Sequence, residues 1–155
     1  MHAIDVMLAT LQGDAEITGI LPGGVWDRPI NPNDDEMRDV VWQEHPLTGI
    51  RVLQPCAVLL PPQEVDSPVS LNPGRRLDTD LWPELVFYAE RMHLSVLDAA
   101  DERAMELLHG LRVGTADIAA TGYRARPLDA DELPGDVWTT LRRYRVQMSR
   151  HIAGE

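Results

Sequence analysis

The chain has 155 residues, of which 44% are hydrophobic and 25% charged, a balance typical of one folded domain with a sizeable core. Its formal net charge is −11, from 25 acidic and 14 basic residues. All 14 bases are arginines, and the absence of lysine excludes a Walker-type ATPase and a Schiff-base enzyme. An acidic surface repels phosphate, which argues against a domain that grips the DNA backbone and is compatible with DNA sliding past.

The sequence also predicts where the protein is made. No apolar run approaches the roughly 20 residues that span a bilayer, and residues 1–5 lack the features of a secretory signal. The single cysteine, Cys56, lies in an apolar run, which predicts a buried and inert thiol. We therefore expect synthesis in the cytoplasm and no membrane partner.

The first residues predict short helices, a strand and a long loop. Apolar residues recur at helical spacing over 4–11, and Asp14 is placed to cap a second short helix. A brief strand is expected at 25–27. Residues 28–49 are turn-forming and acidic, which predicts an exposed loop in which 40–42 form a short strand or a helical fragment.

Two apolar stretches follow, separated by a proline. Residues 48–53 and 56–60 predict one interrupted strand, with Pro55 marking a sheet edge or a bulge. Residues 61–80 contain several prolines and predict a long, partly extended excursion from the sheet, a feature that is commonly functional. Arg75 and Arg76 in this excursion are candidate loop contacts with a partner.

The stretch from Thr79 to Leu111 is the centre of the predicted fold. Residues 84–90 alternate in polarity, which predicts a strand with one buried face. The spacing then becomes helical, with Ser95 as a plausible N-cap and Gly110 or Gly114 as the stop. The apolar stripe of this helix should lie on a sheet and consists of Leu97, Ala100, Ala104, Leu108 and Leu111. The remaining faces carry Asp98, Asp101, Glu102, Arg103 and Glu106.

The last part of the chain predicts an antiparallel hairpin of two strands, 116–126 and 137–149. One face of the second strand carries Trp138, Tyr144, Val146 and Met148, and the other carries Arg143, Arg145 and Gln147. The expected fold is therefore α/β of the α+β kind, a single domain over residues 1–155. A mostly antiparallel sheet packs against one main helix, about 96–109, and the N-terminal helices are short.

No pattern predicts a catalytic, metal or cofactor site. The histidines lack a compact ligand spacing, so His93 and His109 are interpreted as surface or helix-end residues. Residues 129–132 resemble part of a calcium loop but lack its glycine and bidentate glutamate. Nucleophile-elbow, phosphate-loop and dinucleotide motifs are absent. Carboxylates are abundant, so a small cytosolic enzyme that uses paired carboxylates is the alternative from another class.

Arginines gather near the C-terminal end, at Arg124, Arg126, Arg142, Arg143, Arg145 and Arg150. One interpretation is a solvated sheet face crossed by ordinary ion pairs, each worth about 0 to 1 kcal/mol. The other is a basic flank that meets an acidic flank of an identical neighbour, a head-to-tail contact that closes into a ring when the rotation permits. The first five of these arginines are the candidate subunit-interface residues.

The order of these elements resembles the tail terminator (tail-completion) proteins of long-tailed bacteriophages. The resemblance is carried by the helix 4–11, the turn and aromatic strand 22–27, the strand 55–60, the strand and helix 85–88 and 96–108, and the closing strands that end at 143–148. It spans most of the chain but contains patterns and no diagnostic residue. Residues 31–53 depart from it, because they are longer and more acidic than the short link of that family.

This resemblance implies a structural, non-enzymatic virion protein that forms a ring, typically a hexamer, on the last ring of tail-tube subunits. Such a ring stops tube elongation and presents a surface to the head-closure or connector protein, at the head-proximal end of the tail. The implied partners are further copies of the chain, the major tail tube protein and the head-closure protein. Genome DNA passes through the lumen without specific binding. A head–tail adaptor or head-closure ring is the neighbouring alternative.

Overall fold

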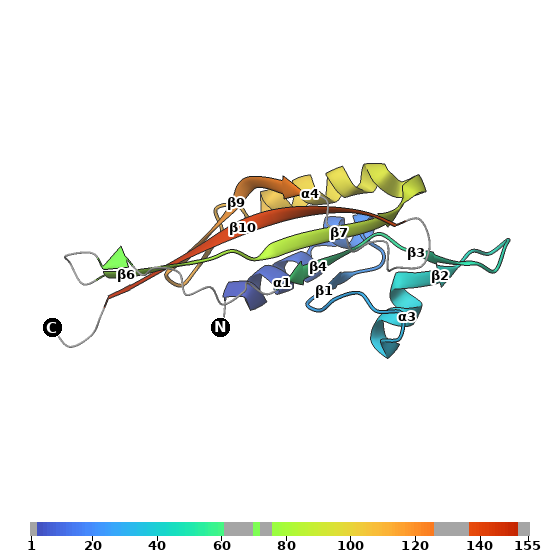
Figure 1. Cartoon of the computed structure of the whole chain (residues 1–155), viewed down its shortest axis with the longest axis horizontal. Coiled ribbons are helices and arrows are strands. Elements are labelled where there is room, and N and C mark those ends of the chain that lie inside the picture. Colours follow the sequence, from blue (N-terminus) through green and yellow to red (C-terminus); the bar gives the residue numbers. More distant parts are fainter. Residues whose placement is uncertain (1–2, 61–69, 72–75, 126–136, 152–155) are drawn as a thin grey trace.

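A mostly antiparallel sheet runs the length of the molecule (Figure 1). The computed structural model describes residues 3–60, 70–71, 76–125 and 137–151. The strands of this sheet are β1 (Val25–Trp26), β4 (Cys56–Leu60), β5 (Ser70–Leu71), β6 (Arg76–Leu81), β7 (Glu84–Glu90), β8 (Arg112–Val113), β9 (Ala116–Ala125) and β10 (Val137–His151). A second, two-stranded sheet consists of β2 (Trp42–Glu44) and β3 (Arg51–Leu53). The helices are α1 (Ala3–Gly13), α2 (Ala15–Ile20), α3 (Asp35–Val41), α4 (Leu94–Leu108) and the 3-10 turn η1 (Arg91–His93).

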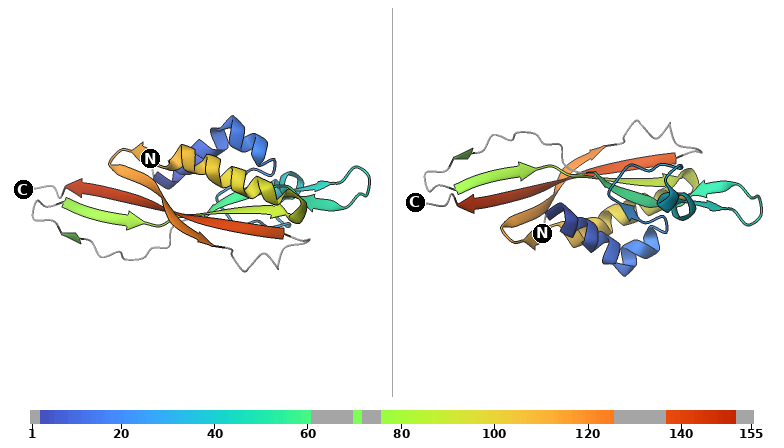
Figure 2. Two further views of the ribbon diagram at one scale, coloured as in Figure 1. Left: turned by 90° about the horizontal axis from the view of Figure 1, so that it is seen from above. Right: turned by 90° about the horizontal axis from the view of Figure 1, so that it is seen from below.

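Strand β10 holds the two halves of the large sheet together. Its first half pairs with β7 and its second half with β6, while β9 pairs along its other edge, all antiparallel. β6 and β7 follow one another along the same edge of β10 and are separated by Trp82 and Pro83. The Pro83 carbonyl accepts a hydrogen bond from the Tyr144 N–H at 2.8 Å, so the ladder continues across the break. The end of the β6–β10 ribbon reaches past the helices (Figures 1 and 2).

Helices α1, α2 and α4 cover one face of the sheet (Figure 2). The predicted apolar stripe is confirmed, because Leu97, Ala100, Ala104 and Leu108 are buried and Leu111 is half-buried. They form one core cluster with the sheet residues Leu85, Phe87, Tyr144 and Val146. The expected α+β class, with a mostly antiparallel sheet packed on a main helix and short N-terminal helices, is confirmed.

A second apolar cluster lies where α3 and the β2–β3 hairpin pack on the sheet. Met37, Val41 and Trp42 contribute from this unit and meet Cys56 and Val58 on β4. The expectation that the 84–90 strand has a single buried face is wrong, because Val86 on its other face is also buried and Tyr88 packs against the second cluster. The predicted buried thiol is confirmed, and burial raises the pKa of Cys56.

Residues 28–49 are not one long loop, since they contain α3 and β2. Asp34 is the N-cap of α3, and its carboxylate accepts hydrogen bonds from the N–H groups of Glu36 and Met37. The acidic residues that predicted a turn are therefore the start of a helix. Met37 and Val41, four residues apart and both buried, are the helical signal in this segment.

The strand expected across Pro55 is two strands in two different sheets. β3 pairs with β2, whereas β4 pairs with β1 and β7. Residues 61–80 contain β5 and most of β6, and their other residues lie outside the described part of the chain. Within the described residues, no helix is long and apolar enough to cross a membrane.

The N-terminal end of the main helix differs from the prediction, and its C-terminal end agrees with it. α4 begins at Leu94, so His93 and not Ser95 is the N-cap, and His93 makes no side-chain cap. At the other end the prediction holds: Gly110 has φ +84° directly after the C-cap His109. The left-handed conformation favours glycine and ends the helix.

Leu108→Ala tests the helix–sheet core. We expect the free energy of unfolding to fall by about 2 to 5 kcal/mol, because Leu108 is fully buried and alanine leaves a cavity. Urea denaturation followed by circular dichroism measures the change. Leu47→Ala is the control, since Leu47 is 89% exposed and its truncation should change stability by less than about 0.5 kcal/mol. Equal losses in the two variants would contradict the assigned helix face.

Asp14→Asn tests the pH dependence of the contact between α2 and α4. The Arg103 guanidinium and the Ile17 N–H hold the pKa of Asp14 below its ordinary value. The carboxylate therefore stabilises the fold above its ordinary pKa, and this contribution disappears as the pH falls through the folded-state pKa. Asparagine keeps the N-cap, so the variant should have a lower Tm at about pH 7 and a difference that narrows below about pH 4. A difference that stays constant over a thermal-unfolding series in this pH range would contradict the ion pair.

Candidate functional site

The candidate arginine Arg142 is bound to the main helix of its own chain. Its Nε and Nη2 donate to the two carboxylate oxygens of Asp101 at 2.7 and 2.8 Å. The side chains of Arg142 and Asp101 are only 13% and 4% exposed. Nη1 also donates to the Thr121 carbonyl at 2.8 Å, within a β-bulge of β9. Arg142 therefore joins β10, β9 and α4 at one point, and the bond to Asp101 raises its pKa.

Arg124 lies beside this pair, because it is the register partner of Arg142 on β9. Its Nη2 donates to Asp98 on α4, its Nε donates to the Thr140 hydroxyl at 3.2 Å, and the same Nε lies 3.9 Å from Asp101. Two arginines from the sheet thus face two aspartates from one helix. We call these four residues the α4–sheet charge cluster.

Asp101 was expected on an exposed face of the helix and is buried instead. Position 101 lies four residues after Leu97 and three before Ala104, so it belongs to the same face as the apolar stripe. On β10, Arg142 likewise falls on the face that carries Tyr144 and Val146. A single charge that interrupts each of two apolar faces, with opposite signs, was the signal in the sequence for this pair.

Arg143 and Arg145 lie on the opposite face of the sheet. Arg143 Nη2 is 3.7 Å from Glu84 Oε1, and Arg145 Nη2 donates to Asp80 at 3.1 Å. The Arg145 guanidinium also stacks over the ring of Trp82, 5.8 Å from its centroid, and Trp82 is 41% exposed. These side chains form a row of partly exposed charges on the sheet.

The remaining candidates are only partly described. Arg126 and Arg75 lie outside the described residues, and Arg76 opens β6 as the register partner of His151. The predicted basic flank is therefore divided between two faces of the sheet, with Arg124 and Arg142 on the helix side. A role of any of these arginines between subunits stays a prediction.

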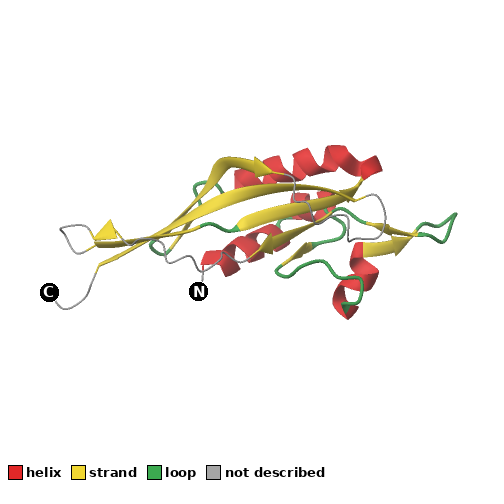
Figure 3. Ribbon diagram, in the orientation of Figure 1, coloured by secondary structure: helices red, strands yellow, loops and turns green. Residues whose placement is uncertain are grey.

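An apolar projection lies at one end of the molecule and was not predicted from the sequence. The β2–β3 hairpin projects past the ends of α3 and α4 (Figures 1 and 3). Its turn carries Leu47, 89% exposed, and Ile50, 64% exposed, and Val40 on the adjoining α3 is 39% exposed. Two aliphatic residues inside a predicted loop were the available signal for a contact surface.

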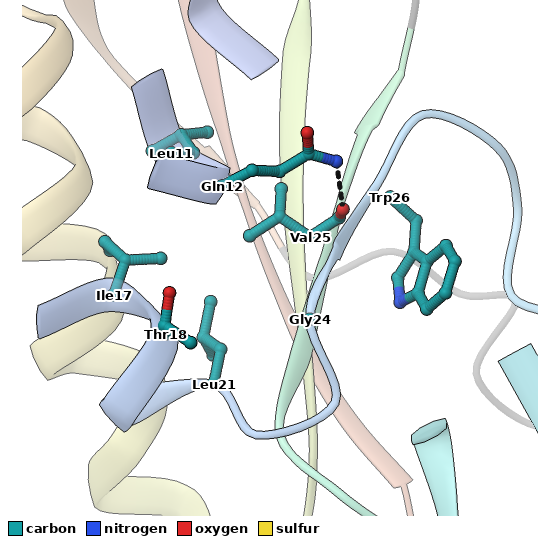
Figure 4. A pocket seen from close by; sticks show the side chains of 8 residues that line it. All are labelled: Leu11, Gln12, Ile17, Thr18, Leu21, Gly24, Val25 and Trp26. Atoms are coloured by element: carbon teal, nitrogen blue, oxygen red, sulfur yellow. Dashed lines mark hydrogen bonds between the residues drawn. The ribbon is translucent and has the colours of Figure 1, made fainter. Parts of the chain in front are cut away.

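A small hollow lies between the N-terminal helices and the edge strand β1 (Figure 4). Its volume is about 250 Å³, and Leu11, Ile17 and Leu21 in its lining are themselves core residues, 1% exposed. Gln12 Nε2 donates to the Val25 carbonyl at 2.9 Å, which occupies a main-chain acceptor of this strand. None of the described residues that line the hollow is titratable, so they offer no acid–base chemistry.

A larger, shallow groove of about 520 Å³ lies between α4 and β9. We call it the α4–β9 groove, and it is lined by Glu102, Met105, Glu106, His109, Ala120, Thr121 and Gly122. The Nδ1 of His109 accepts a hydrogen bond from the Ala120 N–H at 3.0 Å, which removes that nitrogen as a metal ligand. No group of histidine, cysteine and acidic residues in the described part of the chain is arranged to hold a metal ion.

Comparison with known proteins finds a similar fold among solved structures. No protein-family model matches the chain, and no curated protein matches its sequence. The fold is similar to that of a chain in the solved "Virion of native gene transfer agent (GTA) particle", with a TM-score of 0.58 and 14% identity. The similarity covers 97% of this chain and 100% of that one. The two chains therefore share the fold from end to end.

Asp101→Ala tests the buried ion pair. We expect the free energy of unfolding to fall by about 3 kcal/mol, because Arg142 is left buried without its counter-charge. The double variant Asp101→Leu with Arg142→Met should recover much of this loss, since it leaves no uncompensated charge. Arg143→Met is the matched control on the exposed face and should cost less than about 1 kcal/mol. Urea denaturation of the four proteins measures these differences, and equal effects of Asp101→Ala and Arg143→Met would contradict the assignment.

Proposed function

We propose that this protein is a structural component of a phage-like virion and acts as a tail terminator. The observation that carries the proposal is the end-to-end fold similarity to a chain of a gene transfer agent virion. The order of elements, which resembles that of tail terminators, supports the same class. The proposed location is the head-proximal end of the tail, after synthesis in the host cytoplasm.

The proposed mechanism is capping by shape. Copies of the chain form a ring, which we propose to be a hexamer. One side of the ring binds the last tail-tube subunits, and the other side binds the head-closure or connector protein. The elongated molecule has a projecting element at each end, the β6–β10 ribbon and the β2–β3 hairpin (Figure 1). Separate projections favour head-to-tail contacts, which close into a ring when the rotation between copies permits. The net charge of −11 would let DNA pass through the lumen without binding.

Within this proposal the arginines have two roles. Arg143 and Arg145, on the sheet face away from the helices, are the proposed contacts with a neighbouring subunit. Their ion pairs to Glu84 and Asp80 are partly exposed, and such pairs can exchange partners at low cost. Arg124 and Arg142 hold α4 on the sheet and so fix the shape that the ring repeats.

An adaptor or head-closure ring is the second candidate, because the similar chain is described only as part of a whole virion particle. The position of the gene separates the two, since a terminator gene usually lies just upstream of the major tail protein gene. The carboxylate enzyme is less well supported. Its acids would be Glu102 and Glu106, which line a shallow groove and not a closed cleft.

The mass of the native protein and its effect on tail tubes test the proposed function. We expect a ring-sized species, alone or on assembled tube protein, and tubes that stop growing when it is added. Arg143→Glu combined with Arg145→Glu should abolish the ring and leave the monomer folded. Arg112→Glu is the control, because Arg112 is 70% exposed and lies away from this row. A strict monomer that neither binds tube protein nor limits tail length would contradict the proposal.

A further inference from the structure

We infer that the tip of the β2–β3 hairpin, residues 45–50, docks into the α4–β9 groove of a second copy of this chain. The inference rests on the proposed function, because it names the contact through which copies would build the ring. It is carried by the shape of the tip, the chemistry of the groove and the positions of the two in the molecule.

The hairpin tip is held in one conformation by its own hydrogen bonds. The N–H groups of His45 and Gly49 donate to the carbonyls of Ile50 and His45 at 2.8 and 2.9 Å. Leu47 N–H donates to His45 Nδ1 at 3.2 Å, and Ile50 N–H donates to the Thr48 hydroxyl at 3.3 Å. Leu47 and Ile50 are therefore presented to solvent on a pre-formed turn, so docking would require little further ordering.

The tip itself carries no negative charge, and Glu44 directly precedes it on β2. Residues 45–51 include His45 and Arg51 but no acidic residue, although the net charge of the whole chain is −11. The only ion pair of Arg51 among the described residues is with Asp39, and both side chains are well exposed, at 46% and 69%. Arg51 is therefore available to a second carboxylate near the tip.

The α4–β9 groove has the complementary chemistry. Met105 and Ala120 supply apolar lining, and Glu102 and Glu106 supply carboxylates beside it. Glu106 is bound to Arg103 at 3.0 Å, whereas Glu102 is exposed and forms no ion pair with another described residue. An apolar tip followed by an arginine fits an apolar groove next to an unpaired glutamate. None of the described residues that line the smaller hollow in Figure 4 is acidic, so this hollow fits the tip less well.

The tip and the groove lie at different ends of the same helix. The hairpin projects from the end of the molecule at which α4 begins, and the groove follows the C-terminal half of α4 (Figures 1 and 2). A tip cannot reach the groove of its own chain. The contact is therefore between unlike surfaces of two copies, and repetition of such a contact produces a ring or an open filament.

Cysteine cross-linking tests the contact directly. A chain with Leu47→Cys is mixed with a chain with Gly122→Cys under oxidising conditions, and we expect a disulfide-linked pair. Gly122 accepts a side chain, because an added Cβ meets no atom within 4 Å, and the natural Cys56 is buried and silent. Ala9→Cys, on an exposed position of α1, replaces Gly122→Cys in the control mixture. Equal yields in the two mixtures would overturn the inference.

A charge exchange separates this inference from the proposed function. Glu102→Arg should weaken self-association about tenfold or more, measured by sedimentation, and adding Arg51→Glu should restore it. Asp5→Arg is the control, with the same change of charge at an exposed position of α1. If the wild-type protein and the Glu102→Arg variant assemble equally well, only the tip–groove contact is contradicted. Wild-type protein that never assembles, even with tube protein, would contradict the ring itself.

Discussion

The contact between Asp101 and Arg142 determines how the two layers of this protein fit together. Two hydrogen bonds of 2.7 and 2.8 Å join the main helix to the longest strand, in a place where neither side chain is well solvated. Arg142 also binds the Thr121 carbonyl, so the bulge of β9 is fixed by the same guanidinium. Helix position, strand register and bulge geometry therefore depend on one another. A buried pair of this kind contributes more to the uniqueness of the arrangement than to its net stability, which we offer as a hypothesis for this fold.

Much of the fold could be predicted because the spacing of apolar residues along the chain shows which face of a helix or strand is buried. Strand β7, helix α4 and strand β10 have strong periodicities, and their positions were predicted to within a few residues. Helix α3 was missed because Asp34 and its acidic neighbours favour both a turn and a helix start, and only packing decides between them. The pair of Asp101 and Arg142 was missed for another reason. Its members are 41 residues apart, so the two interrupted apolar faces can be recognised as partners only once the helix is placed on the sheet.

The candidate surfaces show the limits of sequence reasoning more sharply. A cluster of arginines is visible in the sequence, and strand alternation alone divides Arg142 and Arg143 between two faces. Only the packing of α4 on the sheet shows that the Arg142 face is the covered one. The exposure of Leu47 and Ile50 depends on a hairpin that lies within a predicted loop. Local patterns identify which residues carry charge or apolar area. The tertiary fold decides which of them are neutralised within the chain and which face a partner.

Two side chains, Gln12 and His109, bind main-chain groups of the sheet that point away from the neighbouring strands. This affects how copies of the protein can associate when many lie close together. Gln12 holds the Val25 carbonyl on the edge strand β1, and His109 holds the Ala120 N–H on β9. Because these main-chain groups are already hydrogen-bonded, a strand of another copy cannot pair with the sheet at these positions. Growth of fibres by strand addition is therefore disfavoured there. Neighbours must then recognise one another by side-chain shape and charge, which a finite assembly can limit. A molecule proposed to end the growth of a polymer would thus carry, at these two places, a safeguard against becoming one.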